Sequence, residues 1–166
     1  IADNPTFQGD PNPHLLYGFS TSLKFKKFSF AVNASGASGF YIYNNTFNSV
    51  TNISNLQNGK NVDASIIGSK ENINASVAVS SRYLEKGDYI KLRNATLSYA
   101  FGDVGKYVKS LNVFVGGSNL FVITKFTGFD PELNVDKNQN GYPSRNIEYI
   151  PYPTPRMITF GFNMSL

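Results

Sequence analysis

The chain ends in the sequence Arg156-Met-Ile-Thr-Phe-Gly-Phe-Asn-Met-Ser-Leu166, in which apolar and polar residues alternate. Successive side chains of a β-strand point to opposite faces, so one face of this segment is apolar and the other is mostly polar. The apolar positions are Ile158, Phe160, Phe162, Met164 and Leu166. The segment has the length of a tilted membrane strand, about 9–11 residues. We therefore expect a terminal transmembrane strand that faces lipid and is read during barrel assembly. The alternative is a half-buried strand of a soluble sandwich.

Four earlier segments show the same alternation. They are residues 15–25, 28–34, 90–101 and 111–117. The third segment changes phase near Asn94, which predicts a β-bulge or a change of environment there. The pair Lys26-Lys27 between the first two segments fits a tight turn that faces water. The sequence thus predicts at least five strands.

The connections between these segments alternate in length. The turns at Lys26-Lys27 and at residues 102–109 are short, whereas residues 41–86 and 126–155 form long connections. Bacterial outer-membrane barrels have short periplasmic turns and long outer loops. A soluble sandwich has no reason to separate its connections in this way. The pattern predicts an all-β, antiparallel transmembrane β-barrel fold whose carboxy terminus is periplasmic and whose long loops are extracellular.

The composition excludes several other classes of protein. Hydrophobic residues make up 41% of the 166 residues, but no apolar run approaches the ~18 residues of a membrane helix. The formal charge is +4, and the lysines are scattered rather than gathered into a nucleic-acid patch. Cysteine is absent and His14 is the only histidine, so we expect neither a disulfide nor an enzyme site.

Several strings resemble the carboxy-terminal portion of the SusC/RagA family of TonB-linked outer-membrane transporters. The strings follow the family's order: GDPNP from Gly9, YLEKGDYIKLRN from Tyr83, GSNLF from Gly117, TKFTGFDPE from Thr124 and YPTPR from Tyr152. The family usually ends on Phe, whereas this chain ends on Leu166.

The resemblance implies a fold and a function. The family's fold is a twenty-two-stranded barrel that encloses an amino-terminal plug. This chain would supply the last five to seven strands, without the plug. The family imports glycans or peptides across the bacterial outer membrane. Its partners are a SusD-like surface lipoprotein, which lids the barrel, and the TonB system, which supplies energy.

Two groups of residues are candidates for binding. Aromatic rings and one arginine in the long connections could contact a ligand or the lipoprotein, or could instead pack the loops together. They are Tyr41, Tyr43, Phe129, Tyr142, Arg145, Tyr149 and Tyr152. A weaker pattern matches the first half of a calcium loop, with oxygen ligands at Asp136, Asn138 and Asn140 and a glycine at position 141. The expected closing glutamate falls one residue late, at Glu148, and we expect no other cofactor.

Two other functions compete with the transporter. A complete small outer-membrane barrel or adhesin would be compatible with the length of the chain. A soluble carbohydrate-binding β-sandwich would pack its alternating apolar faces against one another.

Overall fold

The computed structural model describes residues 7–74, 80–133 and 145–166, which divide into two compact units. The wall unit contains residues 15–38, 89–124 and 154–166. The loop unit contains residues 39–88 and 125–153, together with the start of the chain up to His14, as far as these are described. No helix among the described residues is long and apolar enough to span a membrane.

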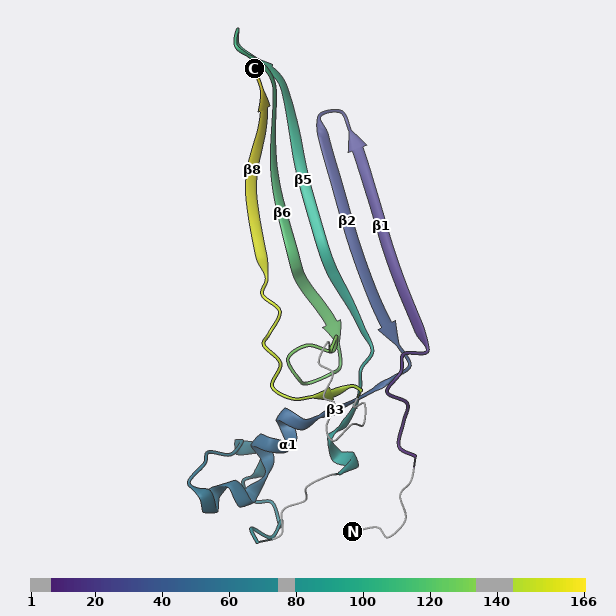
Figure 1. The fold of residues 1–166 in the computed structure, drawn as a ribbon, viewed down its shortest axis with the longest axis vertical. Helices are drawn as coiled ribbons and strands as arrows, with labels where there is room; N and C mark the ends of the chain where they lie inside the picture. The colour runs from purple at the N-terminus through teal and green to yellow at the C-terminus, as the bar shows by residue number, and fades with distance from the viewer. Residues whose placement is uncertain (1–6, 75–79, 134–144) are drawn as a thin grey trace. The chain divides into compact units, whose positions relative to one another are not determined.

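Five antiparallel strands build the wall unit (Figure 1). They are β1 (Leu15–Phe25), β2 (Phe28–Ser38), β5 (Tyr89–Val104), β6 (Val108–Thr124) and β8 (Met157–Ser165), in the spatial order β1-β2-β5-β6-β8. The five predicted strands are thereby confirmed. Three of them run further than the alternation indicated, since β2 continues to Ser38, β5 continues to Val104, and β6 runs from Val108 through Gly116 and Gly117 to Thr124. The sheet is open, because β1 and β8 are its two edges.

The strand register separates an apolar face from a polar face. Residues that lie opposite one another in a sheet share a face, so the pairs Leu23–Phe30, Phe30–Leu97 and Val115–Phe160 continue one apolar row across the strands. This face is exposed, and Phe160 shows 78% of its surface. The soluble-sandwich alternative required such faces to be covered by a second sheet within the fold. The exposure of the face argues against that alternative.

A β-bulge in β5 keeps most apolar residues of this strand on one face, although the apolar–polar alternation of its sequence changes phase. The register pairs Asn33 with Asn94 but Ala34 with Leu92, so Arg93 is an extra residue on β5. A bulge of this kind inserts one unpaired residue into a ladder. As a result, Ile90 and Leu92 lie on the same face as residues 95, 97 and 99 despite the change of phase in the sequence. The predicted bulge is confirmed.

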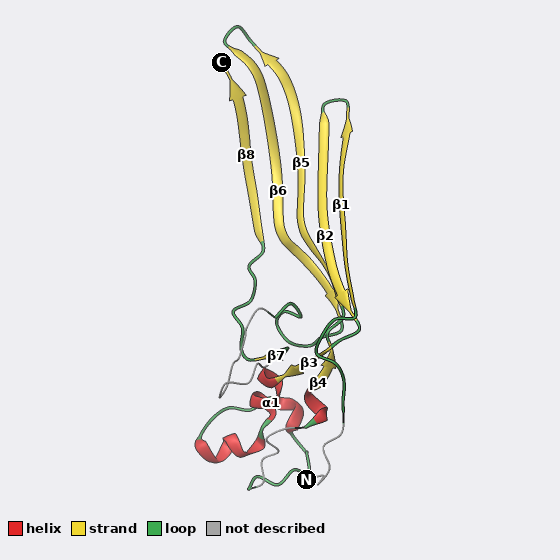
Figure 2. Cartoon of the chain, turned by 45° about the vertical axis from the view of Figure 1, so that its right-hand side comes forward, coloured by secondary structure: helices red, strands yellow, loops and turns green. Residues whose placement is uncertain are grey.

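The loop unit contains short elements rather than only irregular chain (Figure 2). Its strands β3 (Tyr41–Asn44), β4 (Leu84–Lys86) and β7 (Ile147–Glu148) form a sheet in the order β4-β3-β7, in which β3 and β7 are parallel. Helix α1 spans Asn45–Thr51, and 3₁₀ turns span Ile53–Asn58, Ala64–Ile66 and Ser81–Tyr83. The side chains of Phe40, Ile42, Ile66, Tyr83 and Phe126 are buried. The two predicted long connections therefore contribute to one unit with its own core.

Candidate functional site

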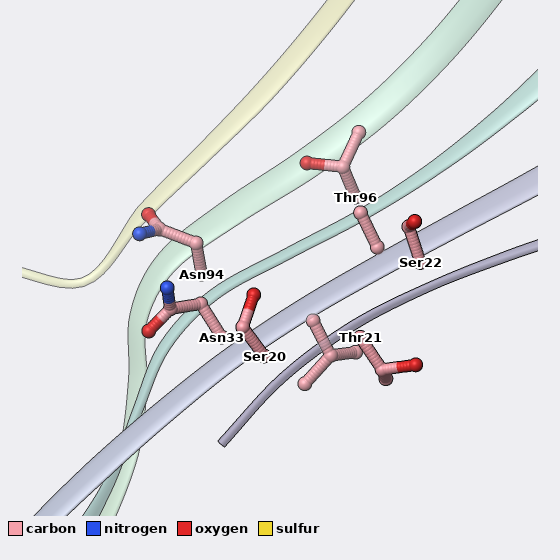
Figure 3. A pocket seen from close by; sticks show the side chains of 8 residues that line it. Ser20, Thr21, Ser22, Asn33, Asn94 and Thr96 are labelled. Atoms are coloured by element: carbon pink, nitrogen blue, oxygen red, sulfur yellow. The ribbon is translucent and has the colours of Figure 1, made fainter. Parts of the chain in front are cut away.

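A shallow hollow of about 270 Å³ lies on the polar face of the wall unit, where β1, β2 and β5 run side by side (Figure 3). Most of its polar lining residues occupy alternate positions of the strands, namely Ser20 and Ser22 of β1, Asn33 of β2, and Asn94 and Thr96 of β5, and Thr21 of β1 lines it as well. A second hollow continues along the same face to Lys24, Ser29 and Ser98. Hydroxyl and amide groups both donate and accept hydrogen bonds. This surface can therefore bind neutral polar groups without a large charge of its own.

The bulge adds a cation to the polar face. Nε of Arg93 donates a hydrogen bond to the hydroxyl of Ser35 at 2.6 Å. Ser35 pairs with Lys91 in the register, and the side chain of Lys91 is buried. Bulges re-aim side chains and are frequent next to functional sites. The change of phase near Asn94 indicated the bulge in the sequence, but it did not indicate which side chains the bulge brings together.

A hydrogen-bond network around the buried side chain of Asn44 connects distant segments of the loop unit. Nδ2 of Asn44 donates to Oε1 of Glu85 at 2.9 Å and to the hydroxyl of Thr127 at 3.1 Å. Glu85 also accepts from the backbone N–H and the hydroxyl of Thr127, each at 2.8 Å. Oδ1 of Asn44 accepts from the backbone N–H of Phe47 and caps α1. One buried asparagine thus joins β3, β4, α1 and the segment after β6.

A second buried group, Glu148, connects β7 to the start of α1. Its side chain is fully buried, and Oε2 accepts from the backbone N–H of Thr46 at 3.1 Å. Oε1 has no hydrogen-bond partner among the described residues. The hydroxyl of Thr46 in turn accepts from the backbone N–H of Ile150 at 3.0 Å. These contacts hold residues 148–150 against the first turn of α1.

The predicted contact residues divide into half-buried and exposed groups. Tyr41 and Tyr43 are half-buried in β3. The hydroxyl of Tyr43 accepts from Asn48 at 3.2 Å, its ring centroid lies 6.2 Å from that of Tyr83, and burial raises its pKa. This environment is that of a packing residue, although contact with a ligand stays a prediction.

The other predicted contact residues face solvent where they are described. Phe129, Tyr149 and Tyr152 are exposed, Tyr152 to 91%. Nη1 of Arg145 donates to Oδ1 of Asn12 at 2.5 Å. Tyr142 lies outside the described residues. None of the six described contact residues lines either of the two hollows on the wall unit.

The candidate calcium ligands Asp136, Asn138 and Asn140 also lie outside the described residues. Within residues 7–74, 80–133 and 145–166, no group of three or more acidic, histidine or cysteine side chains is arranged to hold a metal ion. Calcium binding therefore stays a prediction from the sequence.

The terminal strand β8 forms in the segment that the alternation predicted, and its predicted lipid-facing side chains share one face of the sheet. On this apolar face, the register pairs each of these residues of β8 with a residue of β6. The pairs are Ile158 with Gly117, Phe160 with Val115, Phe162 with Val113 and Met164 with Leu111. Leu166 follows the end of β8 and is exposed. Because these side chains continue an uncovered apolar surface, the strand presents the surface that a lipid contact requires.

Curated relatives cover almost the whole chain. The chain is 29% identical over 169 residues to TonB-dependent receptor P3 of Formosa agariphila, which covers 94% of this chain. It is 23% identical over 144 residues to TonB-dependent receptor SusC of Bacteroides thetaiotaomicron, which covers 80% of it. The chain is a homologue of the TonB-dependent receptors. The predicted resemblance to SusC is thereby confirmed, although no protein-family model matches the chain.

Solved structures support the fold of this TonB-dependent receptor homologue. The structure of the RagAB peptide transporter superposes with a TM-score of 0.75 over 94% of the chain at 21% identity. The RagAB peptide importer in its "closed-closed" state gives the same TM-score over 95% of the chain. The chain spans about a sixth of the length of the relatives, 17% of receptor P3 and 17% of the RagAB chain. The curated homologues are receptors rather than enzymes.

Proposed function

We propose that this chain forms part of the barrel wall and the extracellular loops of an outer-membrane TonB-dependent nutrient importer. The observation that carries the proposal is the two-faced open sheet: an exposed apolar face backs a face of hydroxyl and amide groups. Exposing the apolar face to water would cost free energy, roughly 25 cal/mol for each Å² of apolar surface. Against lipid hydrocarbon on one side and a wet lumen on the other, both faces are satisfied.

The proposed partners follow from the relatives. SusC and the RagAB complex support pairing with a SusD-like or RagB-like surface lipoprotein and energy supply through the TonB system. RagAB is described as a peptide transporter, whereas the hydroxyl-lined wall and the exposed loop rings would suit a glycan equally well. We therefore propose a glycan or a peptide as the substrate. Phe129, Tyr149 and Tyr152 are the described rings that we expect to contact the substrate or the lipoprotein.

The proposed orientation puts the turns at Lys26-Lys27 and at residues 105–107 in the periplasm, together with Leu166. Residues 39–88 and 125–153 would then face the outside. Because the chain has no cysteine, single cysteines can test this orientation with a membrane-impermeant maleimide on intact cells. The exposed Ile67 reports on the loop unit, and the exposed Lys106 reports on the β5–β6 turn.

The expected result is labelling of the Ile67→Cys variant on intact cells, and of the Lys106→Cys variant only after the outer membrane is permeabilised. The reverse pattern would contradict the orientation. A protein that stays in the soluble fraction without detergent would contradict the membrane location itself. Uptake is tested by growth on single glycan or peptide sources with and without the gene, and growth unaffected on every source would contradict nutrient import.

A further inference from the structure

Two lysines form the tight turn between β1 and β2, next to aromatic side chains of the apolar face. Phe25 and Phe28 pair across this turn, and Lys26 adopts a left-handed backbone conformation with φ of 53°. Nζ of Lys26 lies 5.4 Å from the centroid of the Phe25 ring. Nζ of Lys27 donates to the backbone carbonyl of Phe101 at 3.2 Å. Both ammonium groups are therefore positioned where the apolar face ends.

The rings beside this turn form a continuous cluster. The centroids of Phe28 and Tyr99 are 4.7 Å apart, and those of Tyr99 and Phe101 are also 4.7 Å apart, both edge to face. Phe25, Phe28 and Phe101 are exposed. In membrane barrels, aromatic rings of this kind gather at the level of the lipid headgroups. Lysine stems lie along apolar surface there and extend their ammonium groups towards water.

The second short turn has a similar composition at the same end of the sheet. The turn that joins Val104 to Val108 contains Lys106 and Tyr107, and Tyr107 is 78% exposed. The lysines at this end of the wall unit are Lys24, Lys26, Lys27, Lys106 and Lys109, whereas the only carboxylate side chain in residues 24–28 and 100–112 is Asp103. This end of the sheet is positively charged and aromatic.

We propose that Lys26 and Lys27, together with the ring cluster of Phe25, Phe28, Tyr99 and Phe101, bind the headgroup phosphate of an anionic phospholipid. The two ammonium groups supply charged donors for the phosphate oxygens. The rings supply an apolar contact for the glycerol backbone and the first carbons of the acyl chains. The inference rests on the proposed membrane location and on the proposed periplasmic position of this turn, where the adjacent leaflet is phospholipid.

Lys24 provides a matched control. It lies on β1, two residues from Lys26, and pairs with Ser29 on the polar face of the sheet. Its side chain is exposed and lines the second hollow rather than the apolar face. Removing its charge changes the net charge of this end by the same amount as removing that of Lys26. A lipid site on the apolar face requires Lys26 and Lys27 but not Lys24.

The test uses the protein as its cell makes it, purified in detergent and titrated with lipid under native mass spectrometry. The probes are phosphatidylglycerol, phosphatidylcholine, lipid A and inorganic phosphate. We expect phosphatidylglycerol to bind most tightly. The double variant Lys26→Asn, Lys27→Gln should bind it about 25-fold more weakly, or about fivefold for each lysine, since a basic residue near an anionic surface contributes about 1 kcal/mol. Two control variants should bind phosphatidylglycerol as tightly as the wild type does. They are Lys24→Gln and the charge-preserving double variant Lys26→Arg, Lys27→Arg.

Several results would overturn the proposal. Equal affinity for phosphatidylglycerol and phosphatidylcholine would remove the charge requirement. A loss of about fivefold in Lys24→Gln, the loss expected for each of Lys26 and Lys27, would show that the lysines act only by general attraction. Tighter binding of lipid A or of inorganic phosphate would assign the turn to another ligand. A detergent-dependent protein that ignores lipid charge overturns this inference alone, whereas a protein soluble without detergent overturns the proposed function.

Discussion

Nε of Arg93 donates a hydrogen bond to the hydroxyl of Ser35 at 2.6 Å, at the point where β5 contains one residue more than β2. The extra residue keeps Ile90 and Leu92 on the apolar face with Leu97. Without it, the first part of β5 would present these side chains to the polar face, because a shift of one residue exchanges the faces of a strand. The bulge therefore decides which surface of β5 is apolar.

Deletion of Arg93 should prevent assembly of the sheet. The deletion moves either residues 90–92 or residues 95–99 to the wrong face, whereas Arg93→Ala keeps the number of residues and loses only the side-chain contacts. We expect Arg93→Ala to assemble with a stability lower by about 1.5–3 kcal/mol, the contribution of a hydrogen bond to a charged group. The heat-dependent shift in gel migration of folded barrels measures assembly. Equal assembly of the two variants would contradict the role of the bulge.

Gly36 should not tolerate a side chain. A Cβ atom there would lie 2.4 Å from Cε2 of Tyr17 and 2.4 Å from the backbone carbonyl oxygen of Tyr89. The hydroxyl of Tyr17 donates to that same carbonyl at 2.9 Å, so the ring cannot move without losing a hydrogen bond. We expect Gly36→Ala to lower the free energy of unfolding by about 1–3 kcal/mol.

Gly116→Ala is the control for Gly36→Ala. A Cβ atom on Gly116, also inside a wall strand, would meet Oγ1 of Thr96 at 3.4 Å, an ordinary contact. Thermal unfolding in detergent should therefore show a lower midpoint for Gly36→Ala than for Gly116→Ala. The opposite order would show that the close approach of Tyr17 does not constrain the sheet.

Glu148 should be required for the order of the loop unit. Glu148→Ala leaves the backbone N–H of Thr46 without its acceptor, and a buried unsatisfied group costs about 1–3 kcal/mol. Hydrogen exchange of residues 43–48, followed by mass spectrometry, should become faster. Glu71→Ala is the matched control, since Glu71 forms a surface ion pair with Arg82 and such pairs contribute about 0–1 kcal/mol. Unchanged exchange in Glu148→Ala would contradict this role of Glu148.

Tyr43 should make the loop unit sensitive to alkali. Burial raises the pKa of its hydroxyl above the ordinary value of 10.0. The folded state therefore favours the protonated phenol, so its contribution to stability is complete below pH 10.0 and is lost as the pH rises through the folded pKa. The tyrosinate absorbance of the wild type minus that of Tyr43→Phe should show one group that ionises above that value. A difference curve centred at or below 10.0 would contradict the burial effect.

The wall unit was predictable because its determinants are local. Alternation of period two identifies β1, β2, β5, β6 and β8, and the change of phase at Asn94 locates the bulge to within one residue of Arg93. The ends of β2 and β6 were less clear, because glycine and small residues such as Gly36, Gly116 and Gly117 interrupt the apolar pattern while the backbone ladder continues.

The loop unit was not predictable in this way. Its elements are short and are held by contacts between distant residues, such as Asn44 with Thr127 and Thr46 with Glu148, which lie 83 and 102 positions apart. The periodicity of the sequence does not predict contacts between residues so far apart. The polar hollow was missed for a different reason. Apolar residues identify the strands, whereas small polar residues such as Ser20, Asn33 and Thr96 carry no comparable signal in the sequence. The same alternation nevertheless places them together on the opposite face.

The central claim is that the apolar face of the wall unit contacts lipid. Because the chain lacks cysteine, spin labels can be placed singly through Thr159→Cys, Phe160→Cys, Phe162→Cys and Asn163→Cys, and the protein reconstituted in lipid bilayers. Collision with oxygen, which concentrates in hydrocarbon, is then compared with collision with a polar nickel complex. We predict high oxygen accessibility at positions 160 and 162 and low oxygen accessibility at 159 and 163. The same accessibility at all four positions, or the opposite alternation, would contradict the lipid contact.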